Sequence, residues 1–181
     1  MIVFVGASAS GKTELAKLLY KIYSYNKCIT TTTRMMRDDE KQDIDYHFVS
    51  KETFLNIESQ GEFVEVTQYQ ENLYGIQKKD VVMNGVVIVD PTGANSLIKK
   101  LSINVFIVYV ETNEKLRKSR MIKRGDQLQT IENRMKLDQH VFRPEQIKRI
   151  NLYVKNEGEA LEELANRIHN NYQAYMESLN N

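Results

Sequence analysis

Eight residues near the N-terminus, Gly6 to Thr13, constrain the fold more than any other part of this 181-residue chain. They read Gly-Ala-Ser-Ala-Ser-Gly-Lys-Thr and match G-x-x-x-x-G-K-[ST] at every fixed position. The apolar residues 1–5 predict a short buried strand before them, and the segment from Glu14 predicts an amphipathic helix after them. This strand-loop-helix context is the one that a phosphate-binding loop requires.

The residue types explain how such a loop would bind phosphate. Gly6 and Gly11 allow backbone angles that let successive amide N–H groups point inward, and the helix N-terminus adds partial positive charge. Lys12 can reach the terminal phosphates of a nucleotide, and the Thr13 hydroxyl is placed to ligate Mg²⁺. We therefore predict ATP and Mg²⁺ as cofactors and Lys12 as a catalytic residue. The predicted ATP-binding residues of the loop are Gly6, Ala7, Ser8, Ala9, Ser10, Gly11, Lys12 and Thr13. The alternative is a glycine-containing turn that binds nothing.

The composition narrows the class of protein. The formal net charge of +1 argues against nucleic acid or a membrane surface as partner. No apolar run approaches the roughly 18 residues needed to span a bilayer. Cys28 is the only cysteine, which excludes an intramolecular disulfide and a cysteine metal site. Because the chain begins directly with the predicted strand, we expect no targeting peptide and a cytoplasmic location.

Strand and helix patterns alternate along the rest of the chain. Strands are predicted over residues 27–31, 44–49, 63–67, 85–90, 104–110 and 150–154. Helices are predicted from about residue 14 to 23, between Ser50 and Gly61, and over residues 77–83, 94–100, 114–123, 130–141 and 157–179. The 85–90 run is apolar enough to be buried on both faces of a parallel sheet, and Asp90 stands at its C-terminal end, where ligands bind in such sheets. The alternation predicts a three-layer α/β fold with right-handed crossovers.

Several further motifs, in order and at similar spacing, resemble those of the guanylate kinase family. They are Thr30-Thr31-Thr32-Thr33-Arg34 with Arg37 and Glu40, then Asp45-Tyr46-His47-Phe48, Phe63-Val64-Glu65 and Tyr74-Gly75. The resemblance spans nearly the whole chain. It implies a P-loop NTPase fold with a parallel central sheet, an inserted nucleotide-monophosphate-binding subdomain and a lid. The implied division is a core of about 1–30, 81–115 and 142–181, an insert of about 31–80 and a lid of about 116–141.

The resemblance also implies a set of residues that bind the acceptor. Arg34 and Arg37 would hold the phosphate of a nucleoside monophosphate, a task that suits the guanidinium fork. Glu65 would accept hydrogen bonds from the ring N–H and the exocyclic amine of guanine. The other implied substrate-binding residues are Thr30, Tyr46, Tyr74 and Asp90, and Asp90 is also a candidate for indirect contact with Mg²⁺. The alternative for Arg34 and Arg37 is an exposed loop of solvated charges.

A second set of matches lies in the C-terminal half. Arg120, Arg124 and Gly125 resemble the family's R-x-x-x-R-G lid segment, and Arg134 resembles the arginine on the following helix. The resemblance implies that these three arginines are catalytic. Asn156 resembles the asparagine that sits near the adenine of ATP. For Arg117, Arg120 and Arg124 the alternative is a charged helix face.

Two departures from the family pattern leave the substrate open. Ile76 replaces a serine or threonine that helps to read the base, so we expect Ile76→Ser to strengthen GMP binding, and Ile88 replaces an acid of the central strand. The favoured interpretation is ATP-dependent phosphorylation of a nucleoside monophosphate, GMP or dGMP. The alternatives are a kinase of the same fold acting on another nucleotide or on a sugar phosphate such as ribose 1,5-bisphosphate, and a non-catalytic interaction module. A homodimer is left open.

Overall fold

The central sheet contains five parallel strands in the order β2-β7-β1-β8-β9. The structure is a computed structural model that describes residues 1–38, 40–82 and 84–180. The strands are β1 (Ile2–Val5), β2 (Asn26–Lys27), β7 (Gly85–Ile88), β8 (Phe106–Glu111) and β9 (Leu152–Lys155). Since β1 lies between β7 and β8, the strand order reverses at β1, and a crevice for ligands opens at its carboxyl end. The predicted phosphate-binding loop begins at that point.

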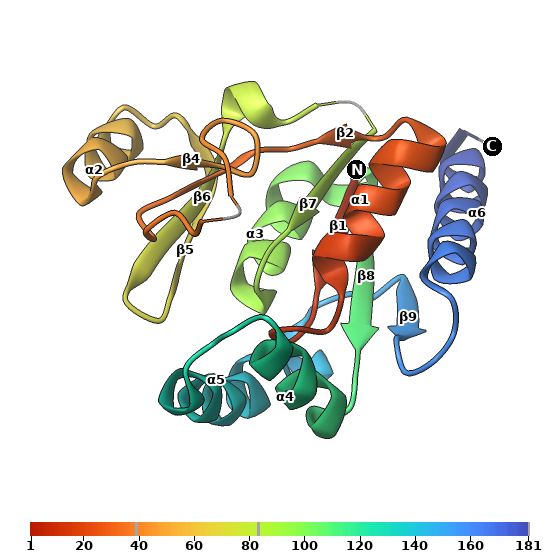
Figure 1. Cartoon of the computed structure of the whole chain (residues 1–181). Helices are drawn as coiled ribbons and strands as arrows, with labels where there is room; N and C mark the ends of the chain where they lie inside the picture. The colour runs from red at the N-terminus through yellow and green to blue at the C-terminus, as the bar shows by residue number, and fades with distance from the viewer. Residues whose placement is uncertain (39, 83, 181) are drawn as a thin grey trace.

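Helices cover both faces of this sheet (Figure 1). Successive side chains of β1 point to opposite faces of the sheet. Ile2 and Phe4 therefore pack into one apolar cluster, and Val3 and Val5 into the other. The first cluster includes residues of α1 (Lys12–Tyr23) and α6 (Leu161–Asn180). The second includes residues of α3 (Pro91–Leu101). The predicted three-layer α/β fold is therefore confirmed.

A second sheet stands beside the first (Figure 1). Its order is β4-β3-β6-β5, with β4 (Tyr46–Phe48), β3 (Thr30–Thr32), β6 (Asn72–Gln77) and β5 (Phe63–Tyr69). Helix α2 (Lys51–Ser59) packs on it through Phe54, whose ring stacks on Phe63 at 4.5 Å. Ser50 caps α2 by accepting from the Thr53 amide, as the sequence predicts. This sheet carries most of the residues expected to bind the acceptor.

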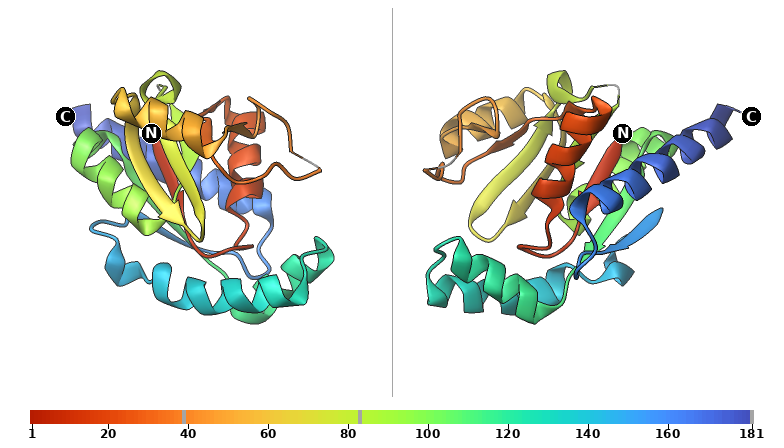
Figure 2. Two further views of the ribbon diagram at one scale, coloured as in Figure 1. Left: turned by 90° about the vertical axis from the view of Figure 1, so that its left-hand side faces the viewer. Right: turned by 45° about the vertical axis from the view of Figure 1, so that its right-hand side comes forward.

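Two further helices lie at the carboxyl edge of the central sheet (Figures 1 and 2). They are α4 (Glu114–Lys123) and α5 (Leu128–Val141), joined by a turn in which Gly125 has a φ of +86°. The short 3-10 segments η1 (Lys78–Asp80), η2 (Ser102–Asn104) and η3 (Pro144–Gln146) complete the described elements. Both helices of the predicted lid therefore lie at the edge where the phosphate-binding loop emerges.

Three predicted elements differ from the structure. The helix predicted over 77–83 is wrong: β6 runs to Gln77 and only η1 follows, while Met83 lies outside the described residues. Pairing of β6 with β5 and β3 overrides the local helical pattern. The strand predicted over 27–31 is divided, because β2 pairs in the central sheet and β3 in the second sheet. The C-terminal helix begins at Leu161 rather than at residue 157.

Within residues 1–38, 40–82 and 84–180, no helix has the length and hydropathy that crossing a bilayer requires.

Candidate active site

The phosphate-binding loop has the backbone geometry that its glycines predict. Gly11 has a φ of +98°, and a Cβ there would lie 2.1 Å from Asn156 Nδ2. Gly6 has a φ of +153°, and a Cβ there would lie 2.3 Å from the Val110 carbonyl oxygen. Both positions therefore exclude any side chain, because of the neighbouring strand ends as well as the backbone angle.

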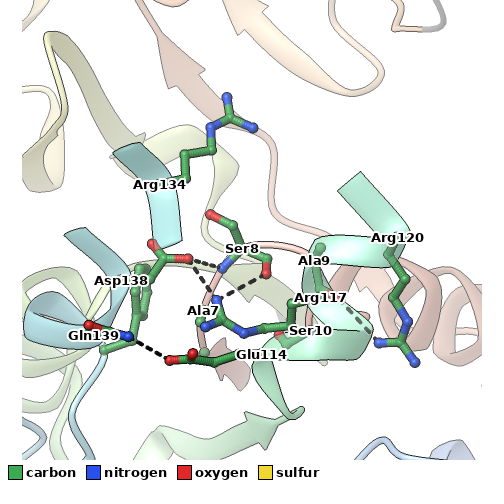
Figure 3. Close-up of polar contacts among 12 residues, drawn as sticks. Ala7, Ser8, Ala9, Ser10, Glu114, Arg117, Arg120, Arg134, Asp138 and Gln139 are labelled. Carbon is green, nitrogen blue, oxygen red and sulfur yellow. Dashed lines mark hydrogen bonds and ion pairs between the residues drawn. The ribbon is translucent and has the colours of Figure 1, made fainter. Parts of the chain in front are cut away.

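Residues at the ends of β8 and β9 hold this loop in place. Asn156 Nδ2 donates to the Ser10 carbonyl oxygen at 2.8 Å, and Thr112 Oγ1 donates to the same oxygen at 3.1 Å. Arg120 lies beside them and donates to the Ala9 carbonyl oxygen at 3.2 Å and to Asn156 Oδ1 at 3.3 Å. The structure thus brings two predicted residues, Arg120 and Asn156, to one side of the loop; Figure 3 shows Arg120 beside Ala9.

The Lys12 side chain folds back against the backbone of the phosphate-binding loop. Its Nζ donates to the carbonyl oxygens of Gly6 at 2.6 Å and Ala7 at 2.8 Å, and to Ser10 Oγ at 3.3 Å. Burial lowers the pKa of Lys12 to about 8. An anion bound nearby would favour the charged form and raise this pKa again.

One pocket joins the phosphate-binding loop to the second sheet. Residues from both parts line it, together with the end of β7 and one aromatic ring after α5. The lining residues are Gly6, Ser8, Lys12, Thr30, Tyr46, Glu65, Thr67, Tyr69, Tyr74, Ile88, Val89, Asp90 and Phe142. A group bound against the second sheet in this pocket would therefore lie close to a phosphate bound in the loop.

Glu65 is the most unusual residue in this pocket. It is only 3% exposed, and its Oε2 has no hydrogen-bond partner among the described residues. Burial, followed by repulsion from Asp90, raises the pKa of Glu65 to about 8. A buried carboxyl without a donor is costly, so Glu65 is suited to a ligand that brings N–H donors into the pocket.

Arg34 and Arg37 share one carboxylate. Arg34 Nη2 donates to Glu40 Oε1 at 2.7 Å, and the Arg37 amide donates to Glu40 Oε2 at 2.9 Å. The Arg34 guanidinium carbon also lies 5.3 Å from the centre of the Tyr46 ring. Glu40 therefore fixes the relative position of the two arginines.

The lid contributes a second pair of arginines. Arg124 and Arg134 both pair with Asp126, Arg134 at 3.1 Å, and Arg134 points away from the loop (Figure 3). Burial lowers the pKa of Arg37, and the positive charges of Arg34, Arg124 and Arg134 lower it further. The lid arginines are thus close enough to the Arg34–Arg37 pair for their charges to interact. Arginines from two parts of the chain therefore lie within electrostatic reach of each other.

The two residues predicted to contact magnesium lie on different elements. The exposed Thr13 side chain stands in the first turn of α1, whereas Asp90 Oδ1 accepts from the Gly93 amide at 2.8 Å and caps α3. Among the described residues, no cluster of three histidine, cysteine or carboxylate side chains could hold a metal. Mg²⁺ that arrives with a nucleotide keeps phosphate and water ligands, so these residues fit a site in which the Thr13 hydroxyl would be a direct ligand and Asp90 would act only through water.

Ile76 is not among the residues that line the pocket. It is fully buried and packs in the apolar cluster that contains Val3, Cys28 and Val87. In the sheet it pairs with Thr30 and Glu65, which do line the pocket, so the effect of a serine at this position on the base stays a prediction. Thr67 does line the pocket, is 7% exposed and lies two residues from Glu65 on β5, so it can present a hydroxyl there.

Sequence reasoning missed four polar residues of the site. Thr112 holds the loop, Thr67 and Tyr69 line the pocket, and Asp138 accepts from the Ser8 amide at 2.7 Å. A periodic signal for Asp138 was present, because it shares one face of α5 with Ile131 and Arg134. Arg117 does not lie on an exposed charged helix face: it is buried and pairs with Asp138 at 3.0 Å.

Together, a phosphate-binding loop at the switch point of a parallel sheet, a second sheet that shares a pocket with it, and two arginine-bearing helices at the same edge are typical of a P-loop kinase. A family model described as guanylate kinase matches residues 1–175, and the chain belongs to the guanylate kinase family.

Individual relatives agree with this assignment. The guanylate kinase of Anaplasma phagocytophilum is 31% identical over 180 residues, which cover 94% of this chain and 84% of that protein. That of Helicobacter hepaticus is 34% identical over 144 residues, 75% of this chain and 72% of that protein. The crystal structure of the Anaplasma phagocytophilum guanylate kinase superposes with a TM-score of 0.70 at 25% identity, over 96% of this chain and 84% of that one.

Proposed function

We propose that the protein transfers the terminal phosphoryl group of ATP to GMP or dGMP, which gives ADP and GDP or dGDP. The observation that carries the proposal is the buried Glu65 carboxyl, which has an oxygen without a partner in the same pocket as Lys12. Family membership supports the same reaction.

The base would be selected at Glu65. Guanine presents a ring N–H beside an exocyclic amine, and one carboxylate can accept from both. Adenine offers no such adjacent pair of donors, so it would leave a buried carboxylate oxygen unpaired. Thr30 and Thr67, which line the same pocket, would add hydroxyl contacts to the bound nucleotide.

The remaining residues would align and neutralise two anions. Arg34, Arg37, Tyr46 and Tyr74 would hold the acceptor phosphate, and Asp90 would border the acceptor. The loop amides and Lys12 would bind the ATP phosphates, and Asn156 would lie near the adenine.

The lid would act on the group in transfer. Arg120, Arg124 and Arg134 would bring positive charge to the transferring phosphoryl group. Mg²⁺ bound with the nucleotide, at the Thr13 hydroxyl, would supply charge neutralisation across the phosphates.

Three parts of the chain would move in this cycle. The proposed parts are a core of about 1–30, 81–115 and 142–181, an insert of about 31–80 and a lid of about 116–141. Closure of insert and lid would exclude water, which would otherwise hydrolyse ATP. The substrates and the free, buried Cys28 support a cytoplasmic location.

Product analysis tests the proposal directly. ³¹P NMR of a mixture of ATP, GMP and Mg²⁺ with the enzyme should show ADP and GDP forming in equal amounts. Lys12→Ala should form neither, since the cation at the terminal phosphates is lost. Binding of GMP and ATP without any GDP would contradict the proposal and favour a non-catalytic module.

A further inference from the structure

A carboxylate from the lid lies in the mouth of the phosphate-binding loop (Figure 3). Asp138 Oδ2 accepts from the Ser8 amide at 2.7 Å and from Arg117 Nη1 at 3.0 Å. Both side chains are buried, at 0% exposure for Asp138 and 5% for Arg117. The phosphoryl transfer proposed above assigns no role to this ion pair.

The same carboxylate also contacts the second sheet. Tyr69, at the end of β5, donates its hydroxyl to Asp138 Oδ1 at 2.7 Å. The Tyr69 hydroxyl oxygen also lies 3.5 Å from Ser8 Oγ. Asp138 therefore connects the phosphate-binding loop, the two lid helices and the insert through one buried group.

The position of Ser8 shows which phosphate its amide would meet. Ser8 and Lys12 line the pocket that Glu65 and Tyr74 also line. The carbonyl groups of the next two loop residues are instead held by Arg120, Thr112 and Asn156. The Ser8 amide thus lies on the acceptor side of the loop, where the terminal phosphate of ATP must lie to meet an acceptor.

An amide N–H and an arginine that converge on one oxygen are donors that a phosphate also uses. We propose that Asp138 competes with the terminal phosphate of ATP for the Ser8 amide and Arg117, and so lowers the affinity for ATP relative to ADP. Both competitors are anions, and like charges cannot share one donor without a large electrostatic cost. ADP lacks the terminal phosphate and meets less of this competition.

Displacement of Asp138 has consequences beyond the loop. Arg117 is released from its counter-charge and becomes available to the terminal phosphate. The Tyr69 hydroxyl loses its acceptor, so the contact between lid and insert is broken in the same step. ATP binding is thereby coupled to the relative position of the two parts that must close over the substrates.

Calorimetric titration of ATP and of ADP, in magnesium buffer and without acceptor, tests this competition. Asp138→Asn keeps the shape and removes the charge, so it should bind ATP about tenfold more tightly and ADP less than about twofold more tightly. Glu132→Gln makes the same change of charge at an exposed position on the same helix and should bind both nucleotides as the wild type does.

A second variant guards against a folding defect. Asp138→Asn leaves Arg117 buried without a counter-charge, which can lower the thermal unfolding midpoint. Tyr69→Phe keeps the ion pair and removes only one donor to the carboxylate. Asp138 is then easier to displace, and ATP should bind about twofold to fivefold more tightly.

The outcomes separate this inference from the proposed function on which it rests. If Asp138→Asn folds, unchanged or weaker ATP binding by this variant overturns the inference, as does an equal gain in affinity for ADP and ATP. If it does not fold, the same results with Tyr69→Phe overturn the inference. Such results leave the kinase proposal intact if the wild type binds ATP. Failure of the wild type and both variants to bind ATP contradicts both.

Discussion

The Glu65 carboxylate lies directly against Gly93, the third residue of α3. A Cβ added at Gly93 would stand 3.0 Å from Glu65 Oε2 and 3.1 Å from Val89 Cβ. The Gly93 amide also donates to Asp90 Oδ1, which caps the helix. The start of α3 and the buried acid fit together because residue 93 has no side chain.

This contact predicts that Gly93→Ala impairs GMP binding without unfolding the protein. The added methyl would displace Glu65 by a few tenths of an ångström, and we expect the KM for GMP to rise about threefold to tenfold. Alanine is the better helix former by about 0.8 to 1.0 kcal/mol, so stability should hardly fall. Thr92→Ala, at the exposed neighbouring position, is the matched control. Steady-state kinetics measure this change. An unchanged KM for GMP in Gly93→Ala would contradict the contact between Glu65 and the base.

A second prediction concerns the proton on Glu65. Its pKa of about 8 means that the carboxyl is mostly protonated at pH 7. Two N–H donors from guanine favour the charged form, so GMP binding should release up to about one proton at pH 7 and almost none at pH 9. Calorimetry in buffers of different ionisation enthalpy measures this release. The GMP phosphate titrates near pH 6 in every variant, so the readout is the difference from Glu65→Gln. Equal proton release by both proteins would argue against the contact.

A third prediction concerns the charge on Lys12 and the pH dependence of the KM for ATP. Burial lowers the pKa of Lys12 to about 8, and the ATP phosphates favour its charged form. The free enzyme loses this charge as the pH rises through 8, so the KM for ATP should rise by up to about tenfold from pH 7 to pH 9. Lys12→Arg keeps its charge throughout that range, and its KM, although higher, should be flat. A flat wild-type profile would show that Lys12 does not contact the phosphates.

Ile76 and Thr67 give a paired prediction about stability and binding. Ile76→Ser opens a cavity in a fully buried cluster and should lower the free energy of unfolding by about 2 to 5 kcal/mol. Thr67→Val keeps the volume and removes a hydroxyl from the pocket, so it should raise the KM for GMP about twofold to tenfold with little change in stability. Chemical denaturation and steady-state kinetics separate the two effects. A gain in GMP affinity for Ile76→Ser would show that the side chain reaches the base.

The sequence predicted the loop and the α/β class because those features depend on local residue types. The residue types of Gly11 and Lys12 are enough to indicate a phosphate-binding loop. The alternating strands and helices can be predicted from the hydrophobic pattern of neighbouring residues. The division of residues 26–32 between two sheets could not be predicted, because β2 pairs with β7 about 60 residues away, whereas β3 pairs with β4 and β6, about 16 and 44 residues away. Ion pairs such as Arg117–Asp138 were missed for the same reason. They are polar residues on helices, and only tertiary packing buries them.

The most direct test of the central claim is a coupled assay of ADP release that compares acceptors. GMP and dGMP should give the highest kcat/KM of a panel that also contains AMP, CMP, UMP, dTMP and ribose 1,5-bisphosphate. Because the Glu65 carboxylate can pair with guanine alone among these bases through two adjacent donors, Glu65→Gln should reduce the preference for GMP over AMP by at least about tenfold. A wild-type preference for any acceptor without guanine would contradict the account.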